Sequence, residues 1–360
     1  GRIMGNIALQ YFLRLFPKLA GMTGTAIQSK EEFDTIYGLP TEAISTRLPC
    51  KRIDHPLEMY FDKTEKRKAV IAAIREAHEI SRPVLVGTES IGESEELAEE
   101  LRGLGIECAV LNAKNDEAEA DIISRAGEPG AVTISTNMAG RGVDIKLGGS
   151  DCHAKVEVEK AGGLLVLATA MRESSRITQQ LRGRAGRQGD VGESRFFTAL
   201  DDEIMTRNDL RSLVSGRHYP TERVSGAIGD KALLKEAERI QRISEGNTFD
   251  ERVKLMKYTL IGEKHRAMTF EKRTALLDGS YSSDLWQKHA PDLWDKAVEK
   301  FSDEGTEALQ QKQNIVLAAL LNEFWCDYLD YTAYLREGIH LTQIAGRNPA
   351  EEYNIACEEY

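Results

Sequence analysis

Gln180-Leu-Arg-Gly-Arg-Ala-Gly-Arg-Gln-Gly-Asp190 is the stretch around which the rest of this 360-residue chain is organised. Its arginines alternate with small residues, and glycine lets backbone and guanidinium groups close tightly around an anion. The planar fork of arginine matches phosphate oxygens. Gln180 followed by Arg184 and Arg187 is typical of an arginine-finger loop, which stabilises charge on a transferring γ-phosphoryl group. The alternative is a basic loop that binds any anion or none, and a second motif argues against it.

The second motif is Thr136-Asn-Met-Ala-Gly-Arg-Gly-Val-Asp-Ile-Lys-Leu-Gly-Gly149, directly after the apolar run Ala131-Val-Thr-Ile-Ser135. The run predicts a buried strand. A strand, a glycine loop and then an acid suit a nucleotide site at the end of an open α/β sheet. We expect four residues to bind the nucleotide, the glycines by close approach, the arginine by charge and the acid through a ribose hydroxyl: Gly140, Arg141, Gly142 and Asp144.

The two stretches resemble motifs V and VI of superfamily-2 helicase-type motors, and in detail they resemble the SecA family of preprotein translocase ATPases. Further stretches resemble other parts of that family in the same order along the chain. They are a motif III-like segment, Leu19–Ala26, with Thr23, Gly24 and Thr25; the early second motor domain, Pro83–Ile91 and Val110–Lys114; and the end of the two-helix finger, Tyr334–Leu341.

The composition argues against three classes of protein: membrane-spanning, nucleic-acid-binding and disulfide-rich. Hydrophobic residues make up 41% and charged residues 29% of the chain, and no apolar run is long enough to span a bilayer. The net charge of −11 argues against an extended nucleic-acid interface, which needs a basic surface. The five cysteines form no CxxC pair, so we expect reduced thiols in a cytosolic protein, with neither a disulfide framework nor a metal site.

Continuous apolar runs that alternate with amphipathic helices predict an α/β fold with a doubly wound parallel sheet. The resemblance makes this domain RecA-like and adds an all-α region with a long scaffold helix and a helical hairpin. The expected organisation is as follows: 1–54, tail of a first motor domain; 55–220, second RecA-like domain; 221–278, helical scaffold; 279–311, reduced wing; 312–360, two-helix finger. An ordinary helical bundle is the alternative for the region after 220.

Some expected features are absent or altered in the sequence. There is no GxxxxGK[ST] stretch and hence no P-loop lysine, and Asp201-Asp-Glu203 is interpreted as a helix start and not as a Walker B acid pair. The family reads GTERHESRRID before motif VI where this chain reads Ala168-Thr-Ala-Met-Arg-Glu-Ser-Ser-Arg-Ile-Thr178. Without Walker A and Walker B, the chain alone is predicted to be inactive, and the changed residues suggest a divergent or accessory member.

The resemblance implies the C-terminal part of a motor that pushes unfolded preproteins through the Sec channel. Arg184, Arg187 and Gln180 would act on ATP with Mg²⁺, whose ligands we expect mainly in a missing first motor domain. Tyr331 and Tyr334 would contact polypeptide. Expected partners are a SecY-type channel, unfolded preprotein and an anionic membrane surface, not nucleic acid, with homodimer formation left open. The expected location is cytoplasmic, peripheral on the inner face of the bacterial plasma membrane. The alternatives are a nucleic-acid helicase of superfamily 2 and a non-catalytic binding module.

Overall fold

A computed structural model describes residues 7–111, 119–136, 144–281, 283–302 and 305–360. The chain forms two compact units. The sheet unit comprises Gly21–Asp34 and Leu39–Phe249, and the helical unit comprises Gly1–Ala20, Thr35–Gly38 and Asp250–Tyr360.

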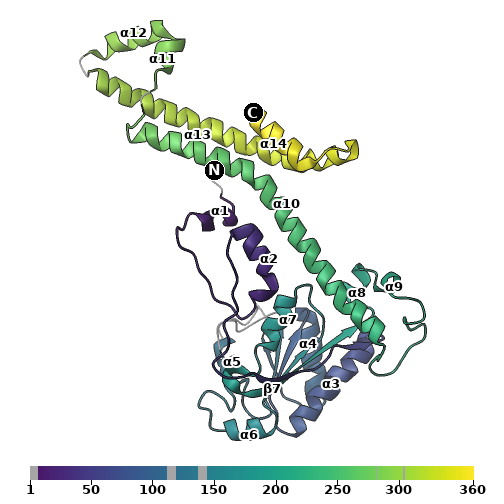
Figure 1. Cartoon of the computed structure of the whole chain (residues 1–360). Helices are drawn as coiled ribbons and strands as arrows, with labels where there is room; N and C mark the ends of the chain where they lie inside the picture. The colour runs from purple at the N-terminus through teal and green to yellow at the C-terminus, as the bar shows by residue number, and fades with distance from the viewer. Residues whose placement is uncertain (1–6, 112–118, 137–143, 282, 303–304) are drawn as a thin grey trace. The chain divides into compact units, whose positions relative to one another are not determined.

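The sheet unit is built on a seven-stranded sheet in the order β1-β7-β6-β3-β5-β4, with β2 also paired to β7 (Figure 1). Every strand pairing among the described residues is parallel, as the sequence predicted. The strands are β1 (Lys51–Asp54), β2 (Glu58–Tyr60), β3 (Val84–Thr88), β4 (Ala109–Leu111), β5 (Val132–Thr136), β6 (Leu164–Ala168) and β7 (Val191–Ala199).

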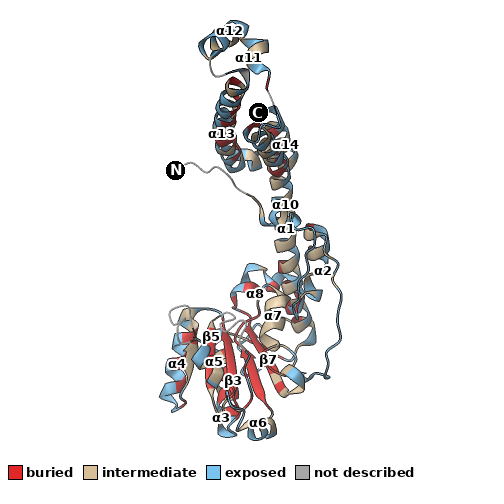
Figure 2. Cartoon of the chain, turned by 90° about the vertical axis from the view of Figure 1, so that its left-hand side faces the viewer, coloured by how far each residue is buried: buried red, intermediate tan, exposed pale blue. Residues whose placement is uncertain are grey.

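The central strands β3, β5 and β6 carry apolar residues and only small hydroxyl-bearing polar ones, such as Thr133 and Ser135, because both faces of the sheet are covered. In β6, Leu165 and Leu167 pack into one apolar cluster with α3 and α4, while Leu164 and Val166 pack into a second cluster on the opposite face. Successive side chains of a strand point to opposite faces, so a run without charged residues is what two covered faces require. Figure 2 shows these strands as the buried centre of the unit.

Two long helices of this unit begin at residues that cap them. Asp62 accepts a hydrogen bond from the Glu65 amide at 2.8 Å before α3 (Lys63–Glu79). Ser90 accepts from the Glu93 amide at 3.1 Å before α4 (Ile91–Gly103), and the Glu93 carboxylate accepts from the Glu89 amide at 2.7 Å. Ser90 followed three residues later by Glu93 predicts a capping box from the sequence, and these two hydrogen bonds confirm it. The shorter helices are η1 (Ile27–Ser29), α2 (Lys30–Glu32), α5 (Glu119–Arg125), α6 (Lys155–Lys160), α7 (Ser175–Arg182), η4 (Arg187–Gly189), α8 (Glu203–Arg207) and α9 (Leu210–Leu213).

The first two strands were not predicted from the sequence. β1 runs beside β7 with Arg52 opposite Gly192, and most of its residues are exposed. A short, exposed strand carries no alternation of apolar and polar residues, so the sequence gives no signal for it. The sheet therefore reaches back to Lys51.

The acidic stretch at 201–203 is a helix start, as interpreted. α8 begins at Glu203, after Asp202. Asp202 is itself buried and accepts hydrogen bonds from the Lys66 ammonium at 2.5 Å, the Thr198 hydroxyl at 2.9 Å and the Ala199 amide at 2.7 Å. Asp202 thus ties α3 to the end of β7.

The long helix predicted after residue 230 is α10 (Lys231–Leu277), which continues unbroken through Gly246 and Gly262 and runs from the sheet unit into the helical unit. The other helices of the helical unit are α1 (Leu9–Arg14), η2 (Phe33–Tyr37), α11 (Leu285–His289), α12 (Pro291–Lys300), α13 (Thr306–Gly338), η6 (Ile339–Ala345) and α14 (Pro349–Glu359).

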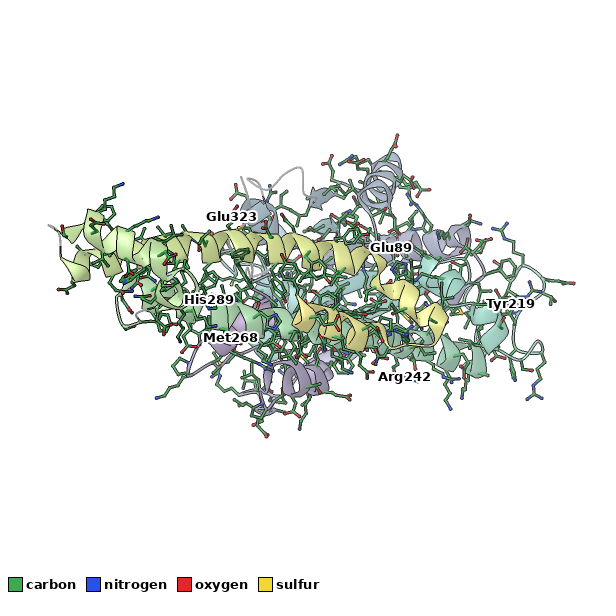
Figure 3. The ribbon with its side chains drawn as sticks, turned by 90° about the horizontal axis from the view of Figure 1, so that it is seen from above. Glu89, Tyr219, Arg242, Met268, His289 and Glu323 are labelled. Atoms are coloured by element: carbon green, nitrogen blue, oxygen red, sulfur yellow. The ribbon has the colours of Figure 1, made fainter. Side chains whose placement is uncertain are left out.

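The helical unit is held together by contacts between α10 and α13. The His265 ring meets the Tyr328 hydroxyl at 2.7 Å, and the Arg273 guanidinium donates to the Asn322 side chain at 2.9 Å. Figure 3 labels Met268 on α10 and Glu323 on α13, which run alongside each other. An apolar cluster of Ile261, Trp325, Tyr328, Tyr353 and Cys357 joins α14 to this pair.

One local prediction is wrong. The apolar run Ile7–Phe16 predicts a short buried helix that stops before Pro17, but α1 (Leu9–Arg14) has no buried residue, and Leu9 is 61% exposed. Six residues form fewer than two turns and offer no wide apolar face for packing.

Among the helices in the described part of the chain, none combines the length and the apolar character needed to cross a membrane.

Candidate functional site

The arginine loop, Gly183–Asp190, connects α7 to β7 at one edge of the sheet. Arg184 is 7% exposed, so its charge is held inside the unit. The Arg187 guanidinium donates back to the Gly183 carbonyl at 2.9 Å and forward to the Asp144 carboxylate at 2.7 Å. The predicted acid after β5 and the predicted arginine after α7 are therefore in direct contact.

Glycine is required in this loop by both backbone conformation and space. Gly186 has φ of 68°, in the left-handed region. A Cβ at this position would lie 2.6 Å from the Cβ of Arg52 on β1. Any L residue here would strain the backbone and displace its neighbour.

We therefore expect Gly186→Ala to lower the free energy of unfolding by about 1–3 kcal/mol, because it places a side chain in a left-handed conformation. Denaturant unfolding measures this change. Gly246→Ala is the matched control: Gly246 lies inside α10 with open space around it, so the same substitution should stabilise by about 0.5–1 kcal/mol. Equal stability of Gly186→Ala and the unsubstituted chain would contradict the requirement.

Gln180 lies at the end of α7 and reaches the motif III-like segment. Its amide nitrogen donates to the Thr25 hydroxyl at 3.4 Å, and the hydroxyls of Thr25 and Thr23 are 3.3 Å apart. Thr25 is buried, whereas Thr23 and Gly24 are exposed. The Gln180 carbonyl oxygen is buried and has no hydrogen-bond partner among the described residues. A buried acceptor without a donor is costly, so this oxygen is suited to a donor supplied by a bound molecule.

Residues of β1 and β7 that were not predicted from the sequence hold the arginine loop in place. Arg52 donates to both carboxylate oxygens of Asp54, at 2.7 and 2.9 Å, and to the Ala185 carbonyl at 3.4 Å. The Ser194 hydroxyl donates to Asp54 at 2.6 Å. Burial alone would raise the pKa of Asp54, but the hydrogen bonds from Arg52 and Ser194 outweigh it, and the pKa is lowered. The available signal was the spacing of Arg52 and Asp54, two apart on one face of a strand.

A cavity of about 560 Å³ opens beside the loop. Its lining includes Arg47 and Arg52 from the segment before and within β1, together with Asp144 and Arg187. Three arginines and one aspartate thus line this space, which favours an anionic ligand that also carries hydroxyl groups.

Other predicted site residues lie elsewhere. Gly140, Arg141 and Gly142 fall outside the described residues. Tyr331 and Tyr334 lie on α13 in the helical unit, where Tyr331 stacks on Tyr360 with ring centroids 4.6 Å apart and Tyr334 is 74% exposed. Within the residues that are described, no group of three or more His, Cys, Asp or Glu side chains could hold a metal ion.

Sequence models of known families match most of the sheet unit. The model of the SecA P-loop domain matches residues 49–157 and 150–214, and that of the SecA DEAD-like domain matches residues 1–34. Among solved structures, the E. coli DEAD-box protein SrmB bound to regulator of ribonuclease activity A aligns at 18% identity over 50% of this chain and 98% of that chain, with a TM-score of 0.35.

Curated relatives align along nearly the whole chain. Protein translocase subunit SecA 2 of Thermobifida fusca is 38% identical over 354 residues, 98% of this chain and 45% of the relative. SecA 2 of Corynebacterium glutamicum is 39% identical over 361 residues, 100% of this chain and 46% of the relative. SecA of Neorickettsia sennetsu is 34% identical over 420 residues, 97% of this chain and 51% of the relative. The chain spans about half the length of these relatives. The matches to both SecA domain models and to these translocase subunits establish that the chain belongs to the SecA family.

Proposed function

We propose that this chain supplies the arginine-finger half of an ATP site in a SecA-type protein translocation motor. The observation that carries the proposal is the convergence of Gln180, Arg184 and Arg187 with Asp144 and Thr25 at one edge of the sheet. These residues come from three separate segments of the sequence. A basic loop without a nucleotide would not need the acid beside it, or a glutamine with a buried, unpaired carbonyl oxygen.

ATP would be held between this chain and a first motor domain that carries the P-loop. The cavity beside the arginine loop suits the ribose and phosphates, with Asp144 accepting from a ribose hydroxyl. Arg184 and Arg187 would neutralise charge on the γ-phosphoryl group as its bond to the leaving phosphate breaks. Arg187 donates to Asp144, so the carboxylate holds the guanidinium near the place where phosphate oxygens would accept its hydrogen bonds.

Gln180 would act as the nucleotide sensor. Its amide nitrogen contacts Thr25 of the motif III-like segment, and its unpaired carbonyl oxygen is available to a water or hydroxyl in the filled site. Gly140, Arg141 and Gly142 would line the phosphate side of the same site. Mg²⁺ would be held mainly by the first motor domain, as the resemblance implies.

The units would divide the work of the motor as the resemblance implies, with 1–54 as the tail of the first motor domain and 55–220 as the second, except that β1 (Lys51–Asp54) pairs with β7 and so belongs with the second. Residues 221–278, 279–311 and 312–360 would be the scaffold, a reduced wing and the two-helix finger. Two findings support this division. The DEAD-like model matches residues 1–34. The alignment with Neorickettsia sennetsu SecA covers 420 positions, more than the 360 residues of this chain, so that relative contains stretches that this chain lacks.

Nucleotide-driven opening and closing of the motor would move the helical unit, which would push unfolded preprotein through a SecY-type channel. The exposed Tyr334 is suited to sequence-tolerant contact with polypeptide, and Tyr331 beside it is partly covered by Tyr360. Work at the channel would place the protein at the inner face of the plasma membrane, against anionic lipid.

The test is ATP turnover by this chain alone and by a protein in which it is joined to a first motor domain. We expect no turnover by the chain alone, because it lacks Walker A and Walker B. We expect turnover by the longer protein to rise with unfolded preprotein and channel-containing membranes. RNA and single-stranded DNA should have no effect, since residues 221–360 contain 18 Lys or Arg against 25 Asp or Glu.

Each alternative function predicts a different result in this turnover assay. Stimulation by single-stranded nucleic acid, with none by preprotein, would establish the helicase alternative. A longer protein that binds nucleotide but never turns it over would establish the non-catalytic module. Turnover by the chain alone, at the level of an intact motor, would overturn the assignment of half a site.

A further inference from the structure

Helix α7 (Ser175–Arg182), which the arginine loop follows, is poorly held by its own residues. None of its eight described residues is buried. Leu181 packs against an apolar cluster of the sheet but is only partly buried. Within the described residues, the N-cap Ser174 makes no side-chain hydrogen bond to the helix. A helix of this length has little stability by itself, so contacts from another element must fix its position.

Two side chains of α10 supply such contacts. The Glu245 carboxylate accepts a hydrogen bond from the Ser175 amide in the first turn of α7. The Gln241 amide nitrogen donates to the Thr178 hydroxyl at 3.1 Å and to the Arg172 carbonyl, just before α7, at 2.7 Å. A carboxylate at a helix N-terminus satisfies an unpaired amide and complements the helix dipole. Glu245 therefore caps α7 from a different helix.

The part of α10 that carries these two side chains is itself firmly anchored. Gln241 and Glu245 are four residues apart, so they lie on one face of the helix. Both belong to the sheet unit. The turns just before them pack into an apolar cluster of that unit through three fully buried residues, Leu233, Ala237 and Ile240. Helix α7 is therefore held by a segment that cannot shift without disrupting the core.

The other end of α7 sets the position of the arginine loop. The Gly183 amide donates to the Gln179 carbonyl in the last turn of α7 at 2.8 Å, and the Arg187 guanidinium donates to the Gly183 carbonyl at 2.9 Å. Gln180 lies in the same turn and donates to Thr25. A displacement of α7 would thus move Gln180 and Arg187 together. A misplacement of about 1 Å can cost about 100-fold in rate.

We propose that Gln241 and Glu245 are positioning residues of the ATP site. They hold α7 in place, so that the arginine loop lies where it can act on the γ-phosphoryl group, and neither side chain needs to contact the nucleotide. This role rests on the proposed function, because it concerns the same site. The alternative is that the two contacts only stabilise the fold. A contact that only stabilises the fold would affect turnover independently of Arg187, whereas a positioning contact would act through it.

The first measurement is amide hydrogen exchange in this chain alone, which does not depend on ATP turnover. Gln241→Leu combined with Glu245→Ala removes both contacts, and we expect the α7 amides to exchange at least about tenfold faster. The α4 amides should be unaffected. Glu245→Gln keeps an acceptor oxygen and should speed exchange less than Glu245→Ala. Glu238→Ala, at an exposed position of α10, is the matched control and should change nothing. Unchanged exchange of α7 in the double variant would overturn the proposal.

The second measurement is ATP turnover by a protein that joins this chain to its first motor domain. We expect the double variant to lower kcat by about 10- to 100-fold, with a much smaller change in KM for ATP. In an Arg187→Ala background the same double variant should lower kcat by less than about threefold, because the arginine that α7 positions is already gone.

Three results would count against this role. Equal losses of kcat in both backgrounds would make the two contacts structural, and turnover of the double variant equal to that of Glu238→Ala would also overturn the positioning role. In both cases the unsubstituted longer protein turns over ATP, so the proposed function stands. No turnover by that unsubstituted protein would refute the proposed function, and the positioning role with it.

Discussion

Arg187→Ala should reduce ATP turnover by about 10³-fold or more in a protein that joins this chain to its first motor domain, the range for a lost arginine finger. The guanidinium lies 2.7 Å from the Asp144 carboxylate, and the Arg187 side chain is 32% exposed. It can therefore reach a ligand in the adjoining cavity without rearrangement of the fold. ATP affinity should change much less, because the finger acts mainly where charge develops in the transition state. Steady-state turnover and nucleotide binding, measured on the same variant, separate the two effects.

Two further variants sharpen this prediction. Arg187→Lys keeps a positive charge but loses the planar fork, so we expect it to restore little of the turnover. Arg125→Ala removes an arginine from α5 whose side chain is 75% exposed and should leave turnover unchanged. Near-normal turnover of Arg187→Ala would make Arg187 a structural partner of Asp144. Loss of nucleotide binding in proportion to turnover would indicate ground-state binding instead.

The sequence could predict the parts of the fold in which burial and chemistry coincide. Predominantly apolar runs became β3, β5 and β6, because strands covered on both faces carry no charged positions and few polar ones. The capping residues Ser90 and Glu93 marked the start of α4 because they satisfy amides that the helix leaves unpaired. The sequence failed at β1, whose exposed residues carry no periodic pattern.

The candidate site shows the same division. The sequence predicts that Arg184, Arg187 and Asp144 share one site, because a phosphate site restricts residue types and spacing. The structure brings Arg187 and Asp144 into contact, and their roles on a nucleotide stay a prediction. Their supports could not be predicted, since the Arg52–Asp54 pair depends on β1 lying next to β7, and Thr25 meets Gln180 across 155 positions of sequence. Pairwise contacts over such separations have no local signature.

The buried pair of Lys66 and Asp202 is the strongest case of a contact that only the structure reveals. Lys66 lies on α3 and is 5% exposed, and Asp202, before α8, is 1% exposed. Their charged atoms are 2.5 Å apart. Removing one partner of a buried pair leaves an uncompensated charge in a medium that solvates it poorly. We therefore expect Lys66→Met to lower the free energy of unfolding by about 3–5 kcal/mol.

Asp202 also accepts from the Thr198 hydroxyl and the Ala199 amide, so its oxygens are needed even when its charge is not. Lys66→Met combined with Asp202→Asn keeps an acceptor for one of these donors and removes the buried charge, and this double variant should be more stable than Lys66→Met alone. Lys68→Met is the control: it breaks the pair with Glu65, but Lys68 is 66% exposed, and the loss should stay below about 1 kcal/mol. Denaturant unfolding of the three variants gives the comparison.

If Lys66→Met were no less stable than Lys68→Met, water would be reaching Asp202 and the pair would not hold α3 to the end of β7. If the double variant were as unstable as Lys66→Met, the loss would come from the packing of the Lys66 stem and not from the unpaired carboxylate.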